Sequence, residues 1–191
     1  DFVGQVGSQR HIYISTNDAG ATGNAGIYRI DDNIIYTLMP ATGTKMISSI
    51  AFLGTNISGK LMAGEVKANA SLATVETWFS PNAGAACPQA TCIIWQKSVK
   101  SPTGGAGSGN ANAQVAWGFG GSRAYCSTSS ANLDAAGWPN GYLTTMALDE
   151  SAFSISLDDG KSWNQISLID TAINFLADVA ASVNSDTLYL A

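Results

Sequence analysis

Four carboxylates that lie outside the expected turns are the side chains best suited to acid–base chemistry: Glu65, Glu76, Asp149 and Glu150. Cleavage of a glycosidic bond usually requires two carboxyl groups that face each other across that bond. Asp149 and Glu150 are neighbours directly before an expected strand, so their side chains point to opposite faces of a sheet. They do not form a working pair, and solvated acids without a catalytic role explain all four residues. We therefore predict no catalytic residue.

The histidine and the paired acids do not suggest a metal site. His11 is the single histidine of the chain, and no two cysteines have the C-x-x-C spacing of a zinc site. Asp31-Asp32 and Asp158-Asp159 each fall in a short turn with too few other oxygen atoms for calcium, and the chemistry of turns explains them. The sequence predicts neither a metal nor a cofactor.

Cysteines and asparagines bear on the compartment in which the protein works. Cys87 and Cys92 enclose four residues, a loop that a disulfide can close, and such a bond would indicate an oxidising compartment. The alternative is that two or three of the cysteines are buried thiols, since Cys126 lies in an apolar strand and has no evident partner. Asn56 and Asn69 begin N-x-S sequons in expected turns or loops, where a secreted eukaryotic protein can carry glycans.

The composition describes a folded chain with few charges. Hydrophobic residues make up 46% of the 191 residues, enough for a substantial core, whereas charged residues make up only 12%. Ala, Gly, Ser, Thr and Asn take their place, as in many exported proteins. The net charge of −5 argues against nucleic acid as a partner, and no apolar stretch approaches the roughly 18 residues of a membrane span.

Short alternating runs bounded by Gly, Pro, Asn and Ser predict an all-β chain. Three hairpin patterns begin about 65 residues apart, near Ile47, Ala113 and Asp178. Each complete unit adds a second hairpin and so has four antiparallel strands. We predict a partial unit, two complete units and the start of another: residues 1–40, 47–98, 113–168 and 177–191.

The second hairpin of the third unit has the most informative turn, S-x-D-x-G-x-x-W at residues 156–163. Asp158 can accept hydrogen bonds from backbone N–H groups one or two residues on, and the Ser156 hydroxyl can satisfy a second turn group. Gly160 supplies the positive φ that a tight turn needs. Trp163 leaves the turn as a large apolar anchor for a neighbouring hairpin.

This octapeptide resembles the Asp-box, or BNR repeat, of β-propellers such as sialidases, sortilin-like receptors and several bacterial surface proteins. The resemblance implies a propeller with four-stranded antiparallel blades, in which the box is a folding device between the third and fourth strands of a blade. Ring closure takes about four to eight blades, so we expect residues 1–191 to be a fragment of a larger propeller. A β-sandwich is the alternative that the strand count permits.

Degenerate boxes fall at the same place in the other units. In the first unit Asn33 replaces Gly160 as the expected left-handed residue, Tyr36 replaces Trp163, and Arg29 stands where the box has Ser. In the second unit an insertion with two cysteines separates the turn from Trp95. The residues of these two boxes are Asp31, Asn33 and Tyr36, then Ser80, Asn82 and Gly84.

The resemblance also raises the question of sialidase chemistry. Sialidases bind the substrate carboxylate with three arginines, and this chain has three in all: Arg10, Arg29 and Arg123. The Phe-Arg-Ile-Pro motif typical of sialidases is missing, and three unrelated surface arginines are the simpler interpretation. Trp138, in a long loop, is the best candidate for a surface contact with a partner or a ligand.

We predict a non-enzymatic structural protein of an extracellular or cell surface, similar to bacterial surface-layer or cell-wall proteins. It would contact other protein subunits of the assembly, and glycans as well. This hypothesis rests on an analogy of fold and composition. One alternative is a carbohydrate-binding or glycoside-hydrolase propeller, sialidase-like, with functional residues in further blades. The other alternative is a propeller that docks proteins through the loops at one rim.

Overall fold

The computed structural model describes eleven segments of the chain: residues 2–6, 9–16, 26–39, 46–55, 57–67, 75–84, 92–103, 110–131, 151–169, 179–182 and 187–190. Within them the fold is all-β, as the sequence predicts, and neighbouring strands pair in antiparallel fashion. A short 3-10 turn, Phe119–Gly121, is the helical exception in these segments. No described segment is a helix long and apolar enough to cross a bilayer.

The strands form three meanders, in which each strand pairs with the next along the chain, and a final hairpin. Unit 1 contains β1 (Phe2–Val6), β2 (Gln9–Thr16), β3 (Gly26–Asp31) and β4 (Ile34–Met39). Unit 2 contains β5 (Met46–Gly54), β6 (Gly59–Lys67), β7 (Thr77–Ser80) and β8 (Gln96–Lys97). Unit 3 contains β9 (Asn110–Trp117), β10 (Ala124–Ala131), β11 (Ser151–Ser156) and β12 (Asn164–Ile169). The C-terminal hairpin contains β13 (Val179–Ala181) and β14 (Leu188–Leu190).

Unit 1 has one strand more than the partial unit that the sequence predicts. The additional strand is β1, which pairs with β2 with Val6 opposite Gln9. Its five residues include Gly4 and are too few for a periodic signal. They form a strand because the edge of β2 offers unpaired backbone N–H and C=O groups.

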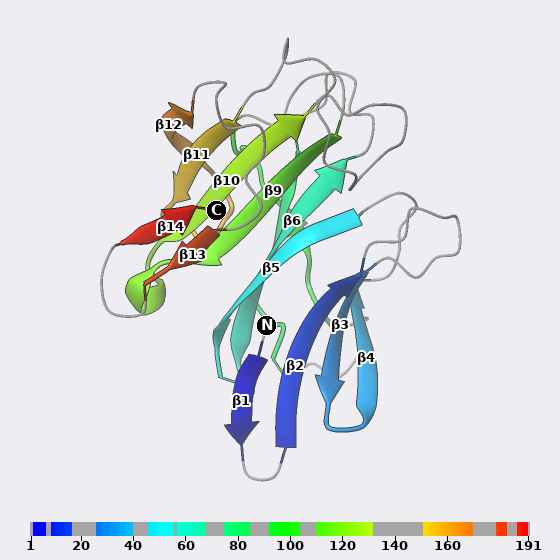
Figure 1. Cartoon of the computed structure of the whole chain (residues 1–191). Coiled ribbons are helices and arrows are strands. Elements are labelled where there is room, and N and C mark those ends of the chain that lie inside the picture. The colour runs from blue at the N-terminus through cyan, green and yellow to red at the C-terminus, as the bar shows by residue number, and fades with distance from the viewer. Residues whose placement is uncertain are drawn as a thin grey trace.

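The units lie next to one another in chain order (Figure 1). Units 2 and 3 share one curved eight-stranded sheet, because the end of β6 pairs with the start of β9. Unit 1 forms its own sheet, and its strand β2 lies beside β5. The C-terminal hairpin lies against β9 and β10 of unit 3.

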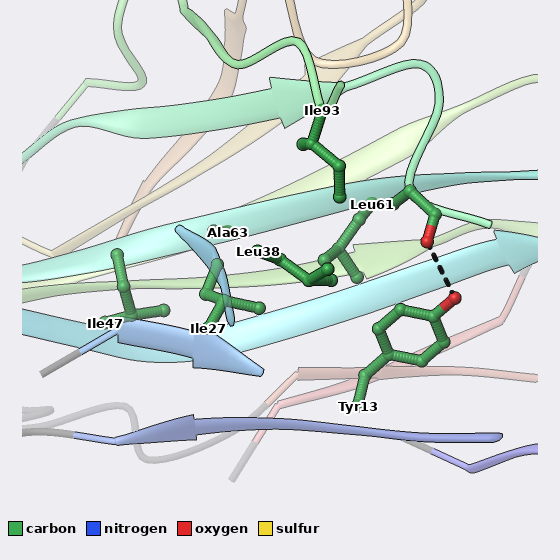
Figure 2. Packing of buried hydrophobic residues seen from close by; sticks show 8 residues of the cluster. Tyr13, Ile27, Leu38, Ile47, Leu61, Ala63 and Ile93 are labelled. Atoms are coloured by element: carbon green, nitrogen blue, oxygen red, sulfur yellow. Dashed lines mark hydrogen bonds between the residues drawn. The ribbon is translucent and has the colours of Figure 1, made fainter. Parts of the chain in front are cut away.

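The two buried hydrophobic clusters each join consecutive units. The first core lies between units 1 and 2 (Figure 2) and contains Tyr13, Ile27, Leu38, Ile47, Leu61, Ala63, Ala83 and Ile93. The second core lies between units 2 and 3 and contains Ala51, Met62, Val75, Ala113, Val115, Ala124, Cys126 and Trp163. Each unit therefore buries its apolar surface against a neighbouring unit.

Strand β6 is buried on both faces. Leu61 and Ala63 point into the first core and Met62 into the second, as the two-residue period of a strand requires. Because neither face is solvated, the middle of the strand, Leu61-Met62-Ala63, is a continuous apolar run instead of an alternating one. Unit 2 is thus covered by unit 1 on one face and by unit 3 on the other.

Units 2 and 3 approach closely at Gly64. A Cβ atom on Gly64 would lie 2.0 Å from the carbonyl oxygen of Ala113, so only glycine fits here. Ser48 donates a hydrogen bond to that same oxygen at 2.9 Å, and the Ser49 hydroxyl accepts one from the backbone N–H of Val115 at 3.0 Å. Side chains of β5 thereby satisfy backbone groups of β9 across the second core.

The close approach predicts a large effect of Gly64→Val. The added side chain must push β6 and β9 apart, at a cost of about 3 kcal/mol in the free energy of unfolding. Gly120→Ala is the control, because nothing lies within 4 Å of a Cβ there and the strain comes only from its φ of +71°, about 1 kcal/mol. Urea unfolding of both variants checks the difference, and equal costs would contradict it.

Candidate functional site

Residues 156–163 form a closed turn, named here the box turn of unit 3. The Ser156 hydroxyl donates to a carboxylate oxygen of Asp158 at 2.7 Å and accepts from the Gly160 N–H at 2.8 Å. Asp158 accepts from the backbone N–H of Ser162 at 2.9 Å and from its hydroxyl at 2.6 Å. Gly160 has a φ of +83°, and Asp159 before it has a φ of +64°. The four predicted box residues thus lie together in one turn.

The hydrogen bonds of this turn set the charge state of Asp158. Partial desolvation raises its pKa, but the hydrogen bonds from Ser162 and Ser156 outweigh that effect and hold the pKa below its ordinary value of 3.8. The carboxylate is therefore ionised in the folded protein at neutral pH. An ionised acceptor strengthens each of these hydrogen bonds.

Trp163 fixes the box turn of unit 3 to unit 2. Its side chain is only 1% exposed and belongs to the second core. The indole N–H donates to the Thr77 hydroxyl at 2.7 Å and lies 3.3 Å from the Ser98 hydroxyl oxygen, and both hydroxyls are buried. A buried indole N–H needs such an acceptor, so the position of unit 3 on unit 2 is specified by hydrogen bonds as well as by apolar contact.

Further contacts join the same turn to unit 2 and to the residues directly after it. The Ser98 hydroxyl lies 2.7 Å from the Gly160 carbonyl oxygen, to which it donates. The Val99 N–H donates to the Lys161 carbonyl at 2.8 Å. Lys60 forms an ion pair with Asp159 at 2.7 Å, with 39% and 29% of the two side chains exposed, so this pair contributes little. The buried contacts of Gly160 and Trp163 hold the turn in place.

Ser80, Asn82 and Gly84 form a corresponding turn, the box turn of unit 2. The Asn82 side-chain oxygen accepts from the Ser80 hydroxyl at 3.2 Å and from the backbone N–H of Ile94 at 2.9 Å. Asn82 therefore makes two of the contacts that Asp158 makes, and the Ile94 N–H takes the place of the Ser162 N–H. Ten residues separate Gly84 from Trp95, whereas two separate Gly160 from Trp163. The insertion preserves the hydrogen bonds that Asn82 accepts from Ser80 and Ile94, whereas the positive φ of Gly160 has no counterpart at Gly84.

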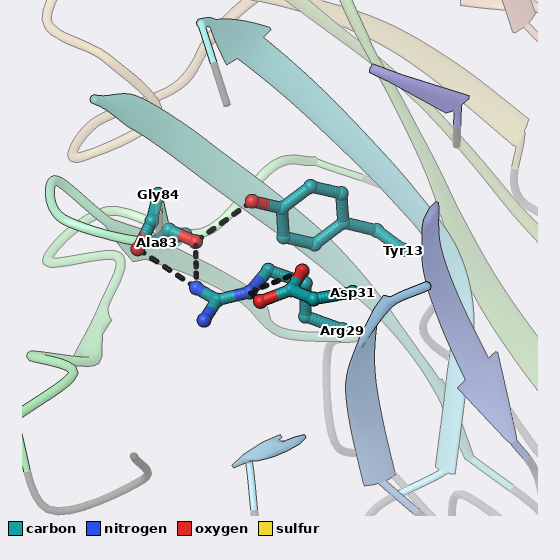
Figure 3. A network of polar contacts seen from close by, with 5 residues as sticks. All are labelled: Tyr13, Arg29, Asp31, Ala83 and Gly84. Atoms are coloured by element: carbon teal, nitrogen blue, oxygen red, sulfur yellow. Dashed lines mark hydrogen bonds and ion pairs between the residues drawn. The ribbon is translucent and has the colours of Figure 1, made fainter. Parts of the chain in front are cut away.

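The box turn of unit 2 is fixed to unit 1 in the same manner. The Trp95 indole N–H donates to the Leu38 carbonyl of β4 at 3.0 Å. The Gly84 carbonyl accepts from Arg29 at 2.8 Å, and the Ala83 carbonyl accepts from the Tyr13 hydroxyl at 2.9 Å (Figure 3). In both turns a tryptophan indole donates to the preceding unit, and the box glycine carbonyl accepts from a buried side chain of that unit.

Several interactions hold Arg29 in its contact with the Gly84 carbonyl. It is fully buried, its Nε donates to both oxygens of Asp31 at 3.0 Å, and it lies 5.0 Å from the ring centre of Tyr36. Burial, opposed by the charge of Arg29, raises the pKa of Tyr13 to about 12. Arg29 is therefore a structural residue and not one of the surface arginines that the sequence suggests, whereas Arg123 is exposed.

The β3–β4 turn of unit 1 departs from the box that the sequence predicts. Its left-handed residue is Asp32, with a φ of 51°, because Asp31 pairs with Ile34 and leaves a two-residue turn. Asn33 therefore does not act as Gly160 does. Tyr36 lies opposite Arg29 and packs on the first core, which is the face toward unit 2, whereas Trp163 packs toward the preceding unit.

The cysteines are in different states. Cys92 is disulfide-bonded, and Cys126 is a free, buried thiol whose pKa is raised by burial. Cys87, the partner that the sequence predicts for Cys92, lies outside the described residues, as do Asn56, Asn69 and Trp138.

Two of the four candidate carboxylates lie in the described segments. Glu65 is buried and accepts from the backbone N–H of Glu76 at 3.2 Å, and Glu76 forms an ion pair with Lys97. Asp149 and Glu150 lie outside the described residues. The described segments contain no group of three or more His, Cys, Asp or Glu side chains that could hold a metal ion.

Comparison with protein-family models, with curated proteins and with solved structures finds no match to the chain. Its functional assignment therefore depends on the geometry of its own residues. Sequence analysis did not identify the residues that form hydrogen bonds with the box turns. Thr77 and Ser98 have the pattern of ordinary strand residues, and Tyr13 that of a core aromatic residue. The one feature of the sequence that could have indicated such a contact was Arg29, a charged residue within the apolar run of β3.

Replacing Trp163 by Phe tests the contact between units 2 and 3. The variant loses the indole N–H and leaves the buried Thr77 hydroxyl without it, at a cost of about 1–3 kcal/mol. Trp95→Phe is the matched variant, and it should cost less because Trp95 is only partly buried. Urea unfolding measures both, and a smaller effect of Trp163→Phe would contradict this role.

The lowered pKa of Asp158 predicts that the stability of the fold depends on pH. Since its folded pKa lies below the ordinary 3.8, its contribution to stability is present at neutral pH and is lost as the pH falls through the folded value. Asp158→Asn, which copies the natural Asn82, should therefore lose less stability between about pH 5 and pH 2. Urea midpoints across that range measure the slope, and parallel curves for wild type and variant would refute the assignment.

Proposed function

We propose that the chain is part of an Asp-box β-propeller that serves as a structural protein of an extracellular surface assembly. The observation that carries this proposal is the repeated contact between box turns and preceding units. A four-stranded unit that packs face to face on the next unit is the building block of a propeller. The Ser80 and Ser156 turns, with Trp95 and Trp163, would then be the joints between blades.

The side chains that could have served chemistry support a structural role. Arg29 holds the Gly84 carbonyl and Asp31, and Asp158 holds Ser162. A substrate carboxylate would have to displace these partners inside a buried site, which costs several kcal/mol for a charged group. This argues for an architectural use of the box over sialidase-like binding at Arg29.

The disulfide of Cys92 supports export. Structural disulfides persist in oxidising compartments such as the cell exterior, and Cys92 is disulfide-bonded next to the box turn of unit 2. Its carbonyl accepts from Asn82 at 2.7 Å, so the covalent bond and the turn stabilise the same segment. The low share of charged residues, 12%, is in keeping with an exported protein.

Surface labelling of intact cells that make the protein tests this proposal. A membrane-impermeant amine reagent should label the exposed Lys161 and Lys100 without lysis, and a cytoplasmic marker protein in the same cells should stay unlabelled. Peptide mapping without reductant should recover Cys92 in a disulfide-linked peptide. Labelling that requires lysis, or a reduced Cys92 in the native protein, would overturn the extracellular role.

A further inference from the structure

The hairpin turns of units 2 and 3 lie at one end of these units and are named here the turn rim (Figure 1). Neighbouring strands are antiparallel within both units, and β6 runs antiparallel to β9. The β5–β6, β7–β8, β9–β10 and β11–β12 turns therefore share that end. A Cβ atom on Gly84 would lie 2.5 Å from the Ile57 carbonyl oxygen, so the first two turns touch. The ion pair of Lys60 with Asp159 joins the β5–β6 turn to the box turn of unit 3.

Exposed apolar side chains stand on all four turns or directly beside them. They are Ile57, Ile94, Val99, Phe119 and Leu157, and they are 52–94% exposed. Turns are ordinarily built from Gly, Pro, Asn, Asp and Ser, and an apolar side chain at such a place adds nothing to the core. Val99 lies against the box turn of unit 3, because its N–H donates to a carbonyl of that turn at 2.8 Å. A single exposed apolar side chain is ordinary, but a group of them on neighbouring turns marks an interaction site.

The turn rim is also positive in an otherwise acidic chain. In the sequence, the four turns and their flanks span residues 54–60, 80–100, 117–123 and 156–163. These ranges contain five lysine or arginine residues and two acidic residues, whereas the rest of the chain contains four and twelve. Lys60 and Lys97 form ion pairs, and the side chains of Lys100, Arg123 and Lys161 are exposed. Exposed cations thus lie beside the exposed apolar side chains.

We propose that the turn rim docks on an anionic lipid surface. Phe119 and Leu157 enter the region between the lipid headgroups, and Lys100 and Lys161 lie at the level of the lipid phosphates. Peripheral membrane contacts combine these two elements, since burial of apolar side chains and attraction to anionic lipids both strengthen binding. The inference goes beyond the proposed function, because a structural role in a surface assembly requires no contact with lipid.

The combination of side chains favours a lipid surface over a soluble anionic polymer. A polymer such as an acidic polysaccharide is bound through its charges and gains nothing from Phe119 and Leu157. A fluid lipid surface accommodates apolar side chains that stand on separate turns, without the fixed complementary shape that a protein partner would need. The two carboxylates of the turn rim are already engaged, because Asp158 accepts hydrogen bonds from Ser162 and Asp159 is ion-paired. They therefore oppose the approach of anionic lipid only weakly.

Co-sedimentation of the full chain with vesicles tests the contact. The wild type should bind phosphatidylglycerol vesicles with half-maximal binding near about 0.1 mM accessible lipid, the range of marginal, reversible membrane binding. It should not bind phosphatidylcholine vesicles. Raising the salt concentration from about 0.1 M to about 1 M should weaken binding, because it screens the lysines. Absence of binding to phosphatidylglycerol, or equal binding to both lipids, would overturn the proposal.

Two pairs of substitutions separate the apolar from the charged part of the contact. Phe119→Ser with Leu157→Ser should weaken binding at least about tenfold, and Lys100→Gln with Lys161→Gln about fivefold for each lysine removed. Ile14→Ser is the matched control, because it removes an exposed isoleucine from the face of β2 and should bind as the wild type does. Unfolding midpoints check that the variants fold, and Val99→Ser replaces the first pair if it does not. An equal loss in Ile14→Ser would contradict the assignment to the turn rim.

A fluorescent label on the turn rim shows which side of the molecule meets the lipid. Leu157→Cys takes an environment-sensitive fluorophore, whereas the buried Cys126 does not react. Its emission should shift to the blue on phosphatidylglycerol vesicles, and a label at Ile14→Cys should not shift.

Two further results would overturn the lipid surface as the partner. One is binding of dextran sulfate that the serine pair leaves unchanged, together with an unshifted label at position 157, which would assign the turn rim to an anionic polymer. The other is a glycan on Asn56 of the native chain, next to Ile57 in the sequence, because the sugar would cover the rim. Surface labelling of cells is independent of these measurements, so either proposal can fail without the other.

Discussion

Burial of both faces of unit 2 is the constraint on which the rest of the structure depends. Leu61 and Met62 are neighbours in β6, and each is buried against a different unit. Full burial of an aliphatic side chain contributes about 1.5–3 kcal/mol to stability. A unit 2 without neighbours would lose this contribution on both faces, and the pairing of its short strands β7 and β8 could not compensate for the loss. The unit therefore gains its stability from being stacked. The positions of its neighbours then have to be specified, since apolar contact alone does not fix a register.

The box turns supply that specification. A buried indole N–H or carbonyl without a partner costs about 1–3 kcal/mol, so Trp163 and Gly160 fit only where Thr77 and Ser98 meet them. Trp95 and Gly84 impose the same condition on Leu38 and Arg29. The hydrogen bonds within each turn, around Asp158 or Asn82, hold its donor and acceptor at a fixed angle. The turn is thus a local device with a long-range consequence.

The sequence predicts the local parts of this structure better than the relations between them. The all-β class, the hairpins and the residues of the 156–163 turn follow from short-range patterns, and so does the place of the 80–84 turn in the repeat. Thr77, Ser98 and Tyr13 could not be identified as partners, because a hydroxyl in a strand has no pattern that reveals what it faces across 60 residues or more. The alignment of Tyr36 with Trp163 rested on position in the repeat, which does not show which face of the sheet a side chain occupies. In the structure Asp31 pairs with Ile34, and Tyr36 packs on the core between units 1 and 2.

The turn of unit 1 differs from the other two in the direction of its contacts. It has no tryptophan directed to a preceding unit, and Arg29, which occupies the position of the box serine, donates forward to the Gly84 carbonyl of unit 2. Tyr36 follows the same direction, since it packs on the core between units 1 and 2. At that interface Arg29 donates forward to unit 2 and Trp95 donates back to unit 1. At the next interface Ser98 donates forward to the Gly160 carbonyl and Trp163 donates back to Thr77. Each interface between units is therefore specified by polar groups from both of its sides.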